Sequence, residues 1–399
     1  MTDDHPGRWR ALLVLSVSQL LGMCTWFAGN AVAPQLGAGW GLDPAAVGWL
    51  TSAVQLGFVA GTAFAALSNL PDLVSGRALV SSCALGAAAA NAALIVAPGY
   101  GAALATRFLT GVFLAGVYPP AMKMAATWFR SGRGFAIGIL IGALTLGKAL
   151  PYALRAIGGV RWQAVVLSVS GGSVVAAALI ALAYADGPFA FPRRPFSWRL
   201  AATVAAHRET RLAIAGYLGH MWELYAMWTW LPAFLAASAI ARGASPGGAG
   251  TTAAAQASAT IAIGAAGCVW GGFMADRMGR ARLVTIAMAA SGACALGIGA
   301  LFGAGPWLLL PVAGAWGFFV IADSAQFSAM VTEVAPPHAV GTALALQTSI
   351  GFLLTAATIQ MVPAIAQRAG WQWAFPVLAA GPAFGIAAIA RLRPQPPRQ

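Results

Sequence analysis

Five ionisable side chains stand inside long apolar stretches of this sequence, in which only 8% of residues are charged; they are Arg107, Lys148, His220, Glu223 and Asp323. An ionisable group in hydrocarbon is costly, and such residues usually mark paths for ions or substrates. A carboxyl group whose contact with water changes can take up and release a proton. We therefore predict proton-coupling sites at Glu223 and Asp323, assisted by His220.

Polar residues accompany these groups at helical spacing. His220 and Glu223 lie three residues apart and share a helix face, and Asp323 and Gln326 repeat that spacing. The ammonium group of Lys148 could hold a carboxylate or another anionic group of a solute. The predicted substrate-binding set is Lys148, Tyr152, Tyr118, Trp26, Asn30, Gln55, Trp230, Gln326 and Gln347.

Other interpretations of the same residues stay open. Glu223 and Lys148 could neutralise one another across a bundle interface, because buried charges are normally paired. His220 could simply bond a backbone carbonyl group. The side chain of Arg107 could extend to the membrane surface, because its residue stands only a short way into an apolar run.

The composition indicates a membrane protein. Hydrophobic residues make up 59% of the 399 residues, the mean hydropathy is +0.76, and apolar runs of spanning length recur along the chain. Long continuous runs argue against a strand-based barrel, which shows short alternating segments. We predict an all-α polytopic protein with twelve spans at roughly 11–33, 45–68, 78–97, 102–127, 135–157, 162–184, 211–238, 255–275, 283–303, 305–332, 342–363 and 372–390.

The basic residues indicate the orientation. An even number of spans puts both termini on one side, where seventeen Lys and Arg residues fall, against four on the other side. Positive residues are retained in cytoplasmic loops, so we expect a multi-pass inner-membrane protein with both termini cytoplasmic. These loops also explain the net charge of +13, and we expect the lipid bilayer but no nucleic acid as a partner.

The first apolar run imitates a signal peptide. Arg8 and Arg10 precede it, and Ala31-Val32-Ala33 near its end resembles a cleavage site. The run from Ala11 to Ala33 is longer than the apolar part of a signal peptide. We interpret it as an uncleaved first spanning helix.

A polar interruption divides the spans six and six. Its prolines and arginines stop a spanning helix and suit the anionic inner leaflet. We predict an N-terminal six-helix bundle over 1–184, a cytoplasmic basic linker over 185–210 and a C-terminal six-helix bundle over 211–399. Gly134-Phe-Ala-Ile and Gly341-Thr-Ala-Leu open the fifth and eleventh spans alike, as an internal duplication would produce.

Cysteine usage and loop length argue against other classes of protein. Cys24, Cys83, Cys268 and Cys294 all lie in apolar runs without a CxxC pair, which favours packing over a disulfide framework or a zinc site. No loop is long enough for a soluble catalytic domain, and no Ser/His/Asp set lies within reach. We predict no enzyme activity, no metal site and no cofactor, with a proton gradient as the energy source.

One charged turn carries a family resemblance. Gly272-x-x-x-Asp276-Arg277-x-Gly279-Arg280 resembles the loop signature of the major facilitator superfamily, and Arg107-x-x-x-Gly111 is similar to its fourth-helix arginine motif. The resemblance implies two six-helix bundles, related by pseudo-two-fold symmetry, around a central cavity that opens alternately to either side. It implies a role in proton coupling for Arg107. It also implies a conformational lock on the cytoplasmic face, formed by Gly272, Asp276, Arg277, Gly279 and Arg280.

Two further comparisons narrow the expectation. Pro151-Tyr152 stands where the antiporters of the family carry Gly-Pro, which argues against drug/proton antiport. The stretches 219–225 and 322–327 look loosely like those of bacterial nitrate and cyanate permeases, although the arginines that nitrate carriers use are missing. We predict a monomeric, proton-coupled transporter of a small organic anion or carboxylate. A drug efflux pump is the main alternative, and a receptor without transport activity is a minor one.

Overall fold

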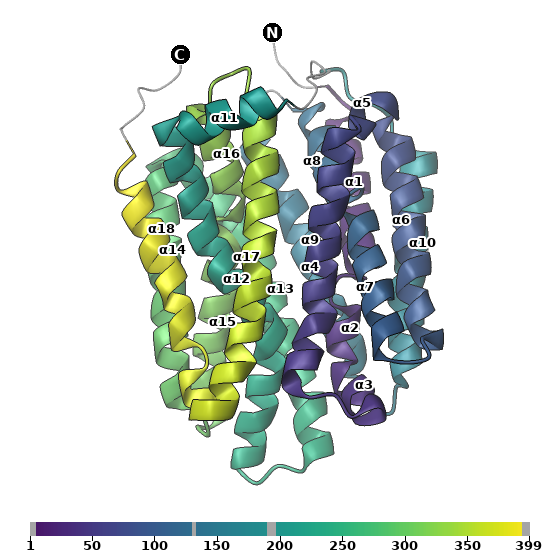
Figure 1. Cartoon of the computed structure of the whole chain (residues 1–399), viewed down its shortest axis with the longest axis vertical. Helices are drawn as coiled ribbons and strands as arrows, with labels where there is room; N and C mark the ends of the chain where they lie inside the picture. Colours follow the sequence, from purple (N-terminus) through teal and green to yellow (C-terminus); the bar gives the residue numbers. More distant parts are fainter. Residues whose placement is uncertain (1–4, 130–132, 190–196, 393–399) are drawn as a thin grey trace.

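The computed structural model describes residues 5–129, 133–189 and 197–392, and within this part of the chain every regular element is a helix (Figure 1). The predicted all-α fold is confirmed. The N-terminal half contains α1 (Arg8–Met23), α2 (Ala28–Ala31), α3 (Ala33–Trp40), α4 (Pro44–Leu67), α5 (Leu70–Leu73), α6 (Gly76–Ala92), η1 (Ala93–Val96), α7 (Tyr100–Leu114), α8 (Tyr118–Ala126), α9 (Arg133–Arg155) and α10 (Trp162–Ala183). The C-terminal half contains α11 (Trp198–Ala206), α12 (Arg208–Ala241), α13 (Pro246–Met278), α14 (Arg280–Gly297), η2 (Ile298–Leu301), α15 (Pro306–Ala322), α16 (Ser324–Val334), α17 (Val340–Ala369), η3 (Trp371–Trp373), η4 (Pro376–Ala379) and α18 (Ala380–Ile389).

Eleven segments of the described chain are long and apolar enough to cross a membrane, between Pro44 and Ile389. The sequence predicts twelve spans, and the one missing from these eleven is the first in the chain, which is divided into shorter helices. We expected one helix over 11–33, but α1 ends at Met23, and the short helices α2 and α3 follow. Pro34 contributes to this division because it lacks a backbone N–H and stands in the first turn of α3. The prediction of a continuous first helix was therefore wrong.

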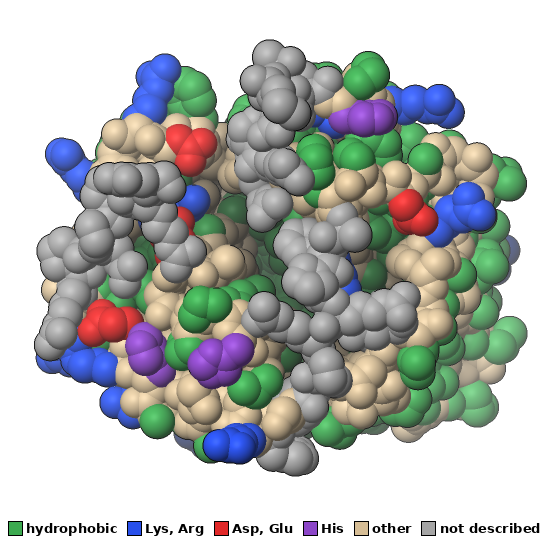
Figure 2. Space-filling view, turned by 90° about the horizontal axis from the view of Figure 1, so that it is seen from above, with side chains coloured by type: hydrophobic (Ala, Val, Ile, Leu, Met, Phe, Trp, Pro, Cys, Tyr) green, Lys and Arg blue, Asp and Glu red, His purple; other side chains and the backbone are tan. Residues whose placement is uncertain are grey.

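The two halves of the sequence form two groups of upright helices (Figure 1). The purple and blue helices stand on the right in this view, and most of the green and yellow helices stand on the left. The described chain begins and ends at the same end of the molecule, which we call the terminal face; the other end is the opposite face. In Figure 2 the terminal face carries its visible Lys and Arg side chains mainly around its edge.

The long helices of the two halves meet through small residues. A Cβ atom added at Gly138 of α9 would lie 3.0 Å from the carbonyl oxygen of Cys268 in α13, and one at Gly142 would lie 3.1 Å from that of Ala265. On the other side of the molecule α4 packs against α17, and the side-chain amide of Gln360 lies 3.3 Å from the Ser52 hydroxyl. Close backbone approach through glycine is how helices pack in lipid.

Within the described chain, three spans are interrupted away from their ends. Besides the first span, the fourth is interrupted between α7 and α8, just before Pro119-Pro120, and the tenth between α15 and α16 at Asp323. Discontinuous helices in transporters place free backbone groups and polar side chains beside the binding site. The space between these three spans is therefore where we expect a binding site.

A short helix precedes the seventh span. Helix α11 lies across the terminal face in Figure 1, where it contacts α12 and α17. Val204 of α11 is buried, and Arg211 donates to the Ala205 carbonyl over 2.8 Å, which satisfies a free carbonyl at the end of this helix. The seventh span, α12, begins at Arg208, near the start at residue 211 that we expected for this span.

Candidate substrate cavity and proton sites

A small cavity of about 30 Å³ lies between the two halves. Its lining residues are Tyr118, Ile141, Leu144 and Lys148 from the N-terminal half, and Tyr217, Met221, Leu224, Tyr225, Ile321, Ser324 and Phe352 from the C-terminal half. One buried water needs about 10–15 Å³ in such terms, so this space holds only one or two waters. The cavity is therefore narrow in this conformation.

Lys148 supplies the only positive charge among these lining residues. Its Nζ lies 2.7 Å from the hydroxyl oxygen of Tyr225, and 4.8–5.0 Å from the ring centres of Trp26, Tyr225 and Trp228. An ammonium group over aromatic faces is stabilised by the ring quadrupoles. No described acidic residue lies within ion-pair distance of Lys148, so in this conformation Glu223 does not neutralise it.

Aromatic residues of both halves close the space beyond Lys148. We call Trp26, Phe27, Phe58, Tyr225, Trp228 and Phe352 the aromatic plug. The rings of Phe58 and Phe352 lie 4.5 Å apart, and those of Phe27 and Tyr225 are stacked at 6.2 Å. Along α12, which starts at the terminal face, the cavity residue Tyr217 comes first and Trp228 comes later. The plug therefore separates the cavity from the opposite face.

Tyr152 and Trp230, both predicted to bind substrate, donate in this conformation to backbone carbonyls that prolines leave free. Pro232 cannot donate to the Trp228 carbonyl, and the Tyr152 hydroxyl lies 3.4 Å from that oxygen. Pro363 likewise cannot donate to the Ile359 carbonyl, which accepts from the indole N–H of Trp230 over 2.7 Å. Both side chains are buried, and neither lines the cavity in this conformation.

His220 and Asp323 form a buried pair behind the cavity. His220 Nδ1 lies 2.9 Å from Asp323 Oδ1, and both side chains are 2% exposed. Helix α12 carries the histidine and the break between α15 and α16 carries the aspartate, next to the cavity residues Ile321 and Ser324. His220 Nε2 has no hydrogen-bond partner in the described chain. The fold thus brings together two of the residues predicted to couple protons.

Glu223 lies apart from the cavity, inside the C-terminal half. The indole N–H of Trp316 in α15 donates to Oε1 over 2.6 Å, and the Ser291 hydroxyl of α14 donates to Oε2 over 2.8 Å. The Glu223 side chain is buried, and it does not line the cavity. It shares α12 with His220, but its hydrogen-bond partners are different.

Arg107 of α7 is fully buried and does not extend to the membrane surface. Its guanidinium donates to the carbonyl oxygens of Thr25 and Trp26, which are freed where the first span is broken, and over 2.8 Å to Asn91 Oδ1. Gly29 makes room for it, because a Cβ there would lie 2.9 Å from Arg107 Nε. In this conformation Arg107 fixes the divided first span.

The remaining predicted polar residues are dispersed. Asn30 accepts from the Thr51 hydroxyl, and both amide atoms of the buried Gln55 lack a partner in the described chain. Gln347 lies 3.5 Å from the Ser328 hydroxyl, and Gln326 accepts from Arg280 over 2.6 Å. Of the nine predicted substrate residues, the structure places only Tyr118 and Lys148 in the cavity lining.

The residues of the predicted conformational lock lie at the C-terminal end of α13 and in the turn into α14. Gly279 has a positive φ of 86° that permits the turn into α14, and Gly272 approaches α9 so closely that a Cβ would lie 3.2 Å from the Gly134 carbonyl. A Cβ at Gly134 would in turn lie 3.7 Å from Asp276 Oδ1, so this carboxylate stands at the positive N-terminal end of α9.

The lock arginines contact their own half. Arg280 donates to Glu333 over 2.7 Å as well as to Gln326, both on α16. The guanidinium of Arg277 lies 4.0 Å from the ring centre of Phe273. Among these residues, Asp276 and Gly272 are the ones placed against the N-terminal half.

Sequence reasoning missed several contact residues. Tyr217 and Tyr225 line the cavity, while Trp316 and Ser291 bond Glu223. The helical spacing of Met221 and Tyr225, on the helix of His220, could have indicated the tyrosine. Nothing in the sequence marks Ser291, because one serine in an apolar run has no pattern.

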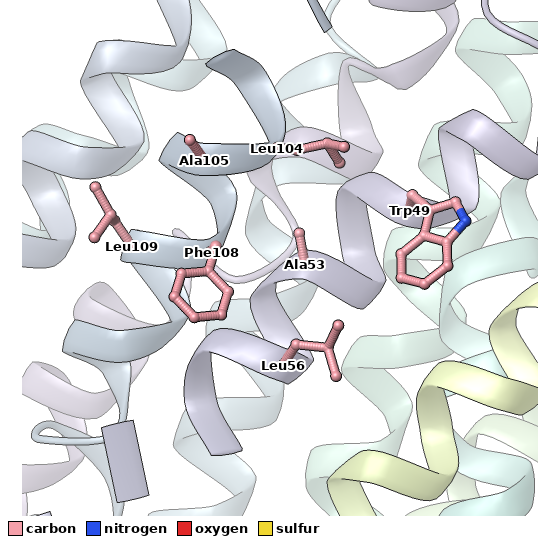
Figure 3. Close-up of a pocket in the computed structure, with 7 residues that line it drawn as sticks. All are labelled: Trp49, Ala53, Leu56, Leu104, Ala105, Phe108 and Leu109. Carbon is pink, nitrogen blue, oxygen red and sulfur yellow. The ribbon is translucent and has the colours of Figure 1, made fainter. Parts of the chain in front are cut away.

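A second groove is apolar and separate from these sites. Figure 3 shows it between α4 and α7, where it measures about 490 Å³ and is lined by Trp49, Ala53, Leu56, Leu104, Ala105, Phe108 and Leu109. Trp49 and Leu109 are exposed on the outside of the bundle. Such a surface suits contact with lipid chains. The described residues contain no group of three or more His, Cys, Asp and Glu residues that could hold a metal ion.

Solved structures with this arrangement are known. The chain is similar to a bacterial homologue of the human lysosomal transporter Spinster, at 17% identity and a TM-score of 0.68 in the inward-facing unoccupied conformation, and at 19% and 0.64 in the occupied one; each match covers 98% of this chain and 95% of the other. It is also similar to the human organic anion transporter MFSD10, at 16% identity and a TM-score of 0.72, over 96% of this chain and 100% of the other.

At these identities the structural likeness shows the fold alone. No curated protein matches the sequence. A family model, described as the Major Facilitator Superfamily, matches residues 15–358, which is most of the chain. This protein therefore belongs to the major facilitator superfamily.

Proposed function

We propose that this secondary transporter carries a small organic anion across the inner membrane by alternating access. The observation that carries the proposal is the ammonium of Lys148, which faces a small cavity between the halves without a carboxylate partner in the described chain. A buried cation that lacks a counter-ion attracts an anionic ligand, because buried charges are normally paired. The name of the similar organic anion transporter MFSD10 agrees with this class of substrate.

The cavity also offers neutral hydrogen-bond donors. The hydroxyl groups of Tyr118 and Tyr217 have no hydrogen-bond partner in the described chain, and Ser324 lies in the same lining. The other lining residues are mostly apolar, such as Met221 and Phe352. We expect a solute with one carboxylate or similar anionic group and a compact apolar body. The narrower resemblance to nitrate and cyanate permeases stays a prediction.

Binding can be linked to movement through Lys148. In this conformation its ammonium is held by Trp26 of the N-terminal half and by Tyr225 and Trp228 of the C-terminal half, all members of the plug. An anion that draws the ammonium into the cavity removes a contact that holds the plug together. The plug then opens toward the opposite face more easily.

We further propose that protons drive the transport in the direction of uptake. One candidate proton carrier is the pair His220–Asp323, whose members are adjacent in sequence to residues that line the cavity. The other is Glu223, which lies inside the same half and away from the cavity. Intramembrane ionisable residues in transporters commonly form such proton relays. Both termini are proposed to lie in the cytoplasm, because most basic residues belong to that side.

A ligand screen tests the substrate class. Purified protein is heated with small carboxylates, amino acids or amphipathic amines, and a compound that binds the folded state raises the unfolding midpoint. The compounds that raise it are then followed as labelled solutes in proteoliposomes. Stabilisation and proton-driven uptake of carboxylates are expected. Stabilisation by amphipathic amines alone, with export from cells, would favour the efflux alternative, and binding without any transport would favour a receptor.

A further inference from the structure

The buried carboxyl group of Glu223 has two hydrogen-bond partners. One of them, Trp316, can only donate a hydrogen bond, and the other, Ser291, can donate and accept. An indole N–H is a donor without acceptor capacity, whereas a hydroxyl group donates one hydrogen and accepts through its oxygen. Trp316 therefore fixes Oε1 as an acceptor in every protonation state. A proton on Glu223 is therefore favoured on Oε2, because there the carboxyl O–H faces an acceptor, the Ser291 oxygen.

Ser291 has two acceptors for its single hydrogen. Its Oγ lies 2.8 Å from Glu223 Oε2 and 3.2 Å from the carbonyl oxygen of Met288, in the preceding turn of α14. Serine hydroxyl groups in helices readily bond a carbonyl of the preceding turn. Both orientations of the hydroxyl therefore lie within hydrogen-bond distance in the same side-chain position.

We infer that Ser291 is a positioning residue that reverses its hydrogen bond when Glu223 gains or loses a proton. With the carboxylate ionised, Ser291 donates to Oε2. When a proton arrives on Oε2, that O–H donates to Ser291 Oγ, and the serine hydrogen turns to the Met288 carbonyl. One proton is added, no bond between heavy atoms changes, and every polar atom remains paired in both states.

The pairing matters because an unmade hydrogen bond is costly in a buried site. Glu223, Ser291 and Trp316 are each no more than 2% exposed. A partner able only to donate would favour the ionised carboxyl group, and one able only to accept would favour the protonated group. A hydroxyl group at this position serves both. The site can thus be loaded and emptied without rearrangement of its three helices.

The other ionisable groups around Glu223 are few. His220 stands on its own helix, Cys294 on α14, and Asp323 at the end of α15. Helix α18, which also packs against α12, carries no ionisable side chain. Glu223 has hydrogen bonds from Ser291 and Trp316 rather than from these groups. Variants at Ser291 therefore change its hydrogen bonding without removing a charge.

Infrared difference spectroscopy of the purified protein in lipid, stepped through pH, tests the inference without any substrate. A carboxyl C=O band that disappears in Glu223→Gln reports the protonated Glu223. Ser291→Ala should move this band to higher frequency, because the carboxyl O–H loses its acceptor. Ser291→Thr, which keeps the hydroxyl, should leave it unchanged. Ser173→Ala is the matched control, because it removes another buried serine hydroxyl that bonds a carbonyl, in the N-terminal half.

Two results would overturn the inference: an unshifted band in Ser291→Ala, or the absence of any band assigned to Glu223. If Ser291→Ala does not fold, Ser291→Cys supplies a weaker hydrogen-bond partner, and an unshifted band there has the same meaning. The role of Ser291 in transport rests on the proposed proton coupling. The infrared test does not depend on that coupling. A shifted band in a protein without proton-driven transport would reject the coupling and retain the role of Ser291.

Discussion

The ammonium of Lys148 lies 2.7 Å from the hydroxyl of Tyr225, and this contact joins α9 of the N-terminal half to α12 of the C-terminal half. The same two residues line the small cavity, and Tyr225 also belongs to the aromatic plug. A ligand that competes for the ammonium therefore acts at once on the binding site and on the barrier.

Replacement of Lys148 by Met should weaken anion binding roughly 10- to 100-fold, the size expected for the loss of a hydrogen bond to a charged group. Lys148→Arg should retain part of the affinity because it keeps the charge. Lys123→Met, which removes a lysine exposed on the protein, is the control. Isothermal titration with a carboxylate found in the ligand screen measures the effect. Wild-type affinity in Lys148→Met would rule out the lysine as the anion site.

Asp323→Asn should abolish proton-driven accumulation while it preserves exchange of labelled for unlabelled solute. The amide retains a polar partner for His220 but cannot carry the charge that alternates with a proton. Uptake in proteoliposomes, with and without a pH gradient, separates the two activities. Glu223→Gln should have the same effect if both carboxyl groups belong to one relay. A variant that accumulates solute at the wild-type level identifies a carboxyl group that is not a coupling site.

Arg107→Met should lower stability by about 1–3 kcal/mol, because it leaves the freed carbonyls of Thr25 and Trp26 without a donor. Gly29→Ala should cause a similar defect by pushing the guanidinium away from them. The midpoint of thermal unfolding in detergent measures both, and the exposed Arg282→Met serves for comparison. If Arg107→Met keeps the wild-type midpoint and loses only proton coupling, the predicted coupling role outweighs the structural one.

Gly57→Leu should destabilise the N-terminal half by about 1–3 kcal/mol or more, because its Cβ would lie 1.9 Å from the Phe108 carbonyl oxygen and force α4 away from α7. Gly171 of α10 is the matched control, since nothing lies within 4 Å of its added Cβ and the residue is exposed. Gly171→Leu should express and unfold like the wild type. Equal stability of the two variants would contradict the packing role assigned to Gly57.

Hydrophobicity and local motifs by themselves determined the fold class and the family of this protein. Continuous apolar runs have few folding options in lipid, because backbone groups must be satisfied within the segment, and so the all-α architecture follows from them. The charged turn at Gly272–Arg280 indicated the family that the match over residues 15–358 establishes. The rarity of ionisable residues in such runs singled out Lys148, His220, Glu223 and Asp323, all of which are buried.

Only the tertiary structure decided how these groups are paired. Lys148 and Glu223 have complementary charges, yet one contacts aromatic rings of both halves and the other is bonded inside one half. His220 pairs with Asp323, far away in the sequence, because the tenth span breaks beside α12. Helical spacing places residues on one face of one helix. Contacts between helices depend on their packing, on breaks in the spans and on carbonyls freed by prolines, none of which periodicity records.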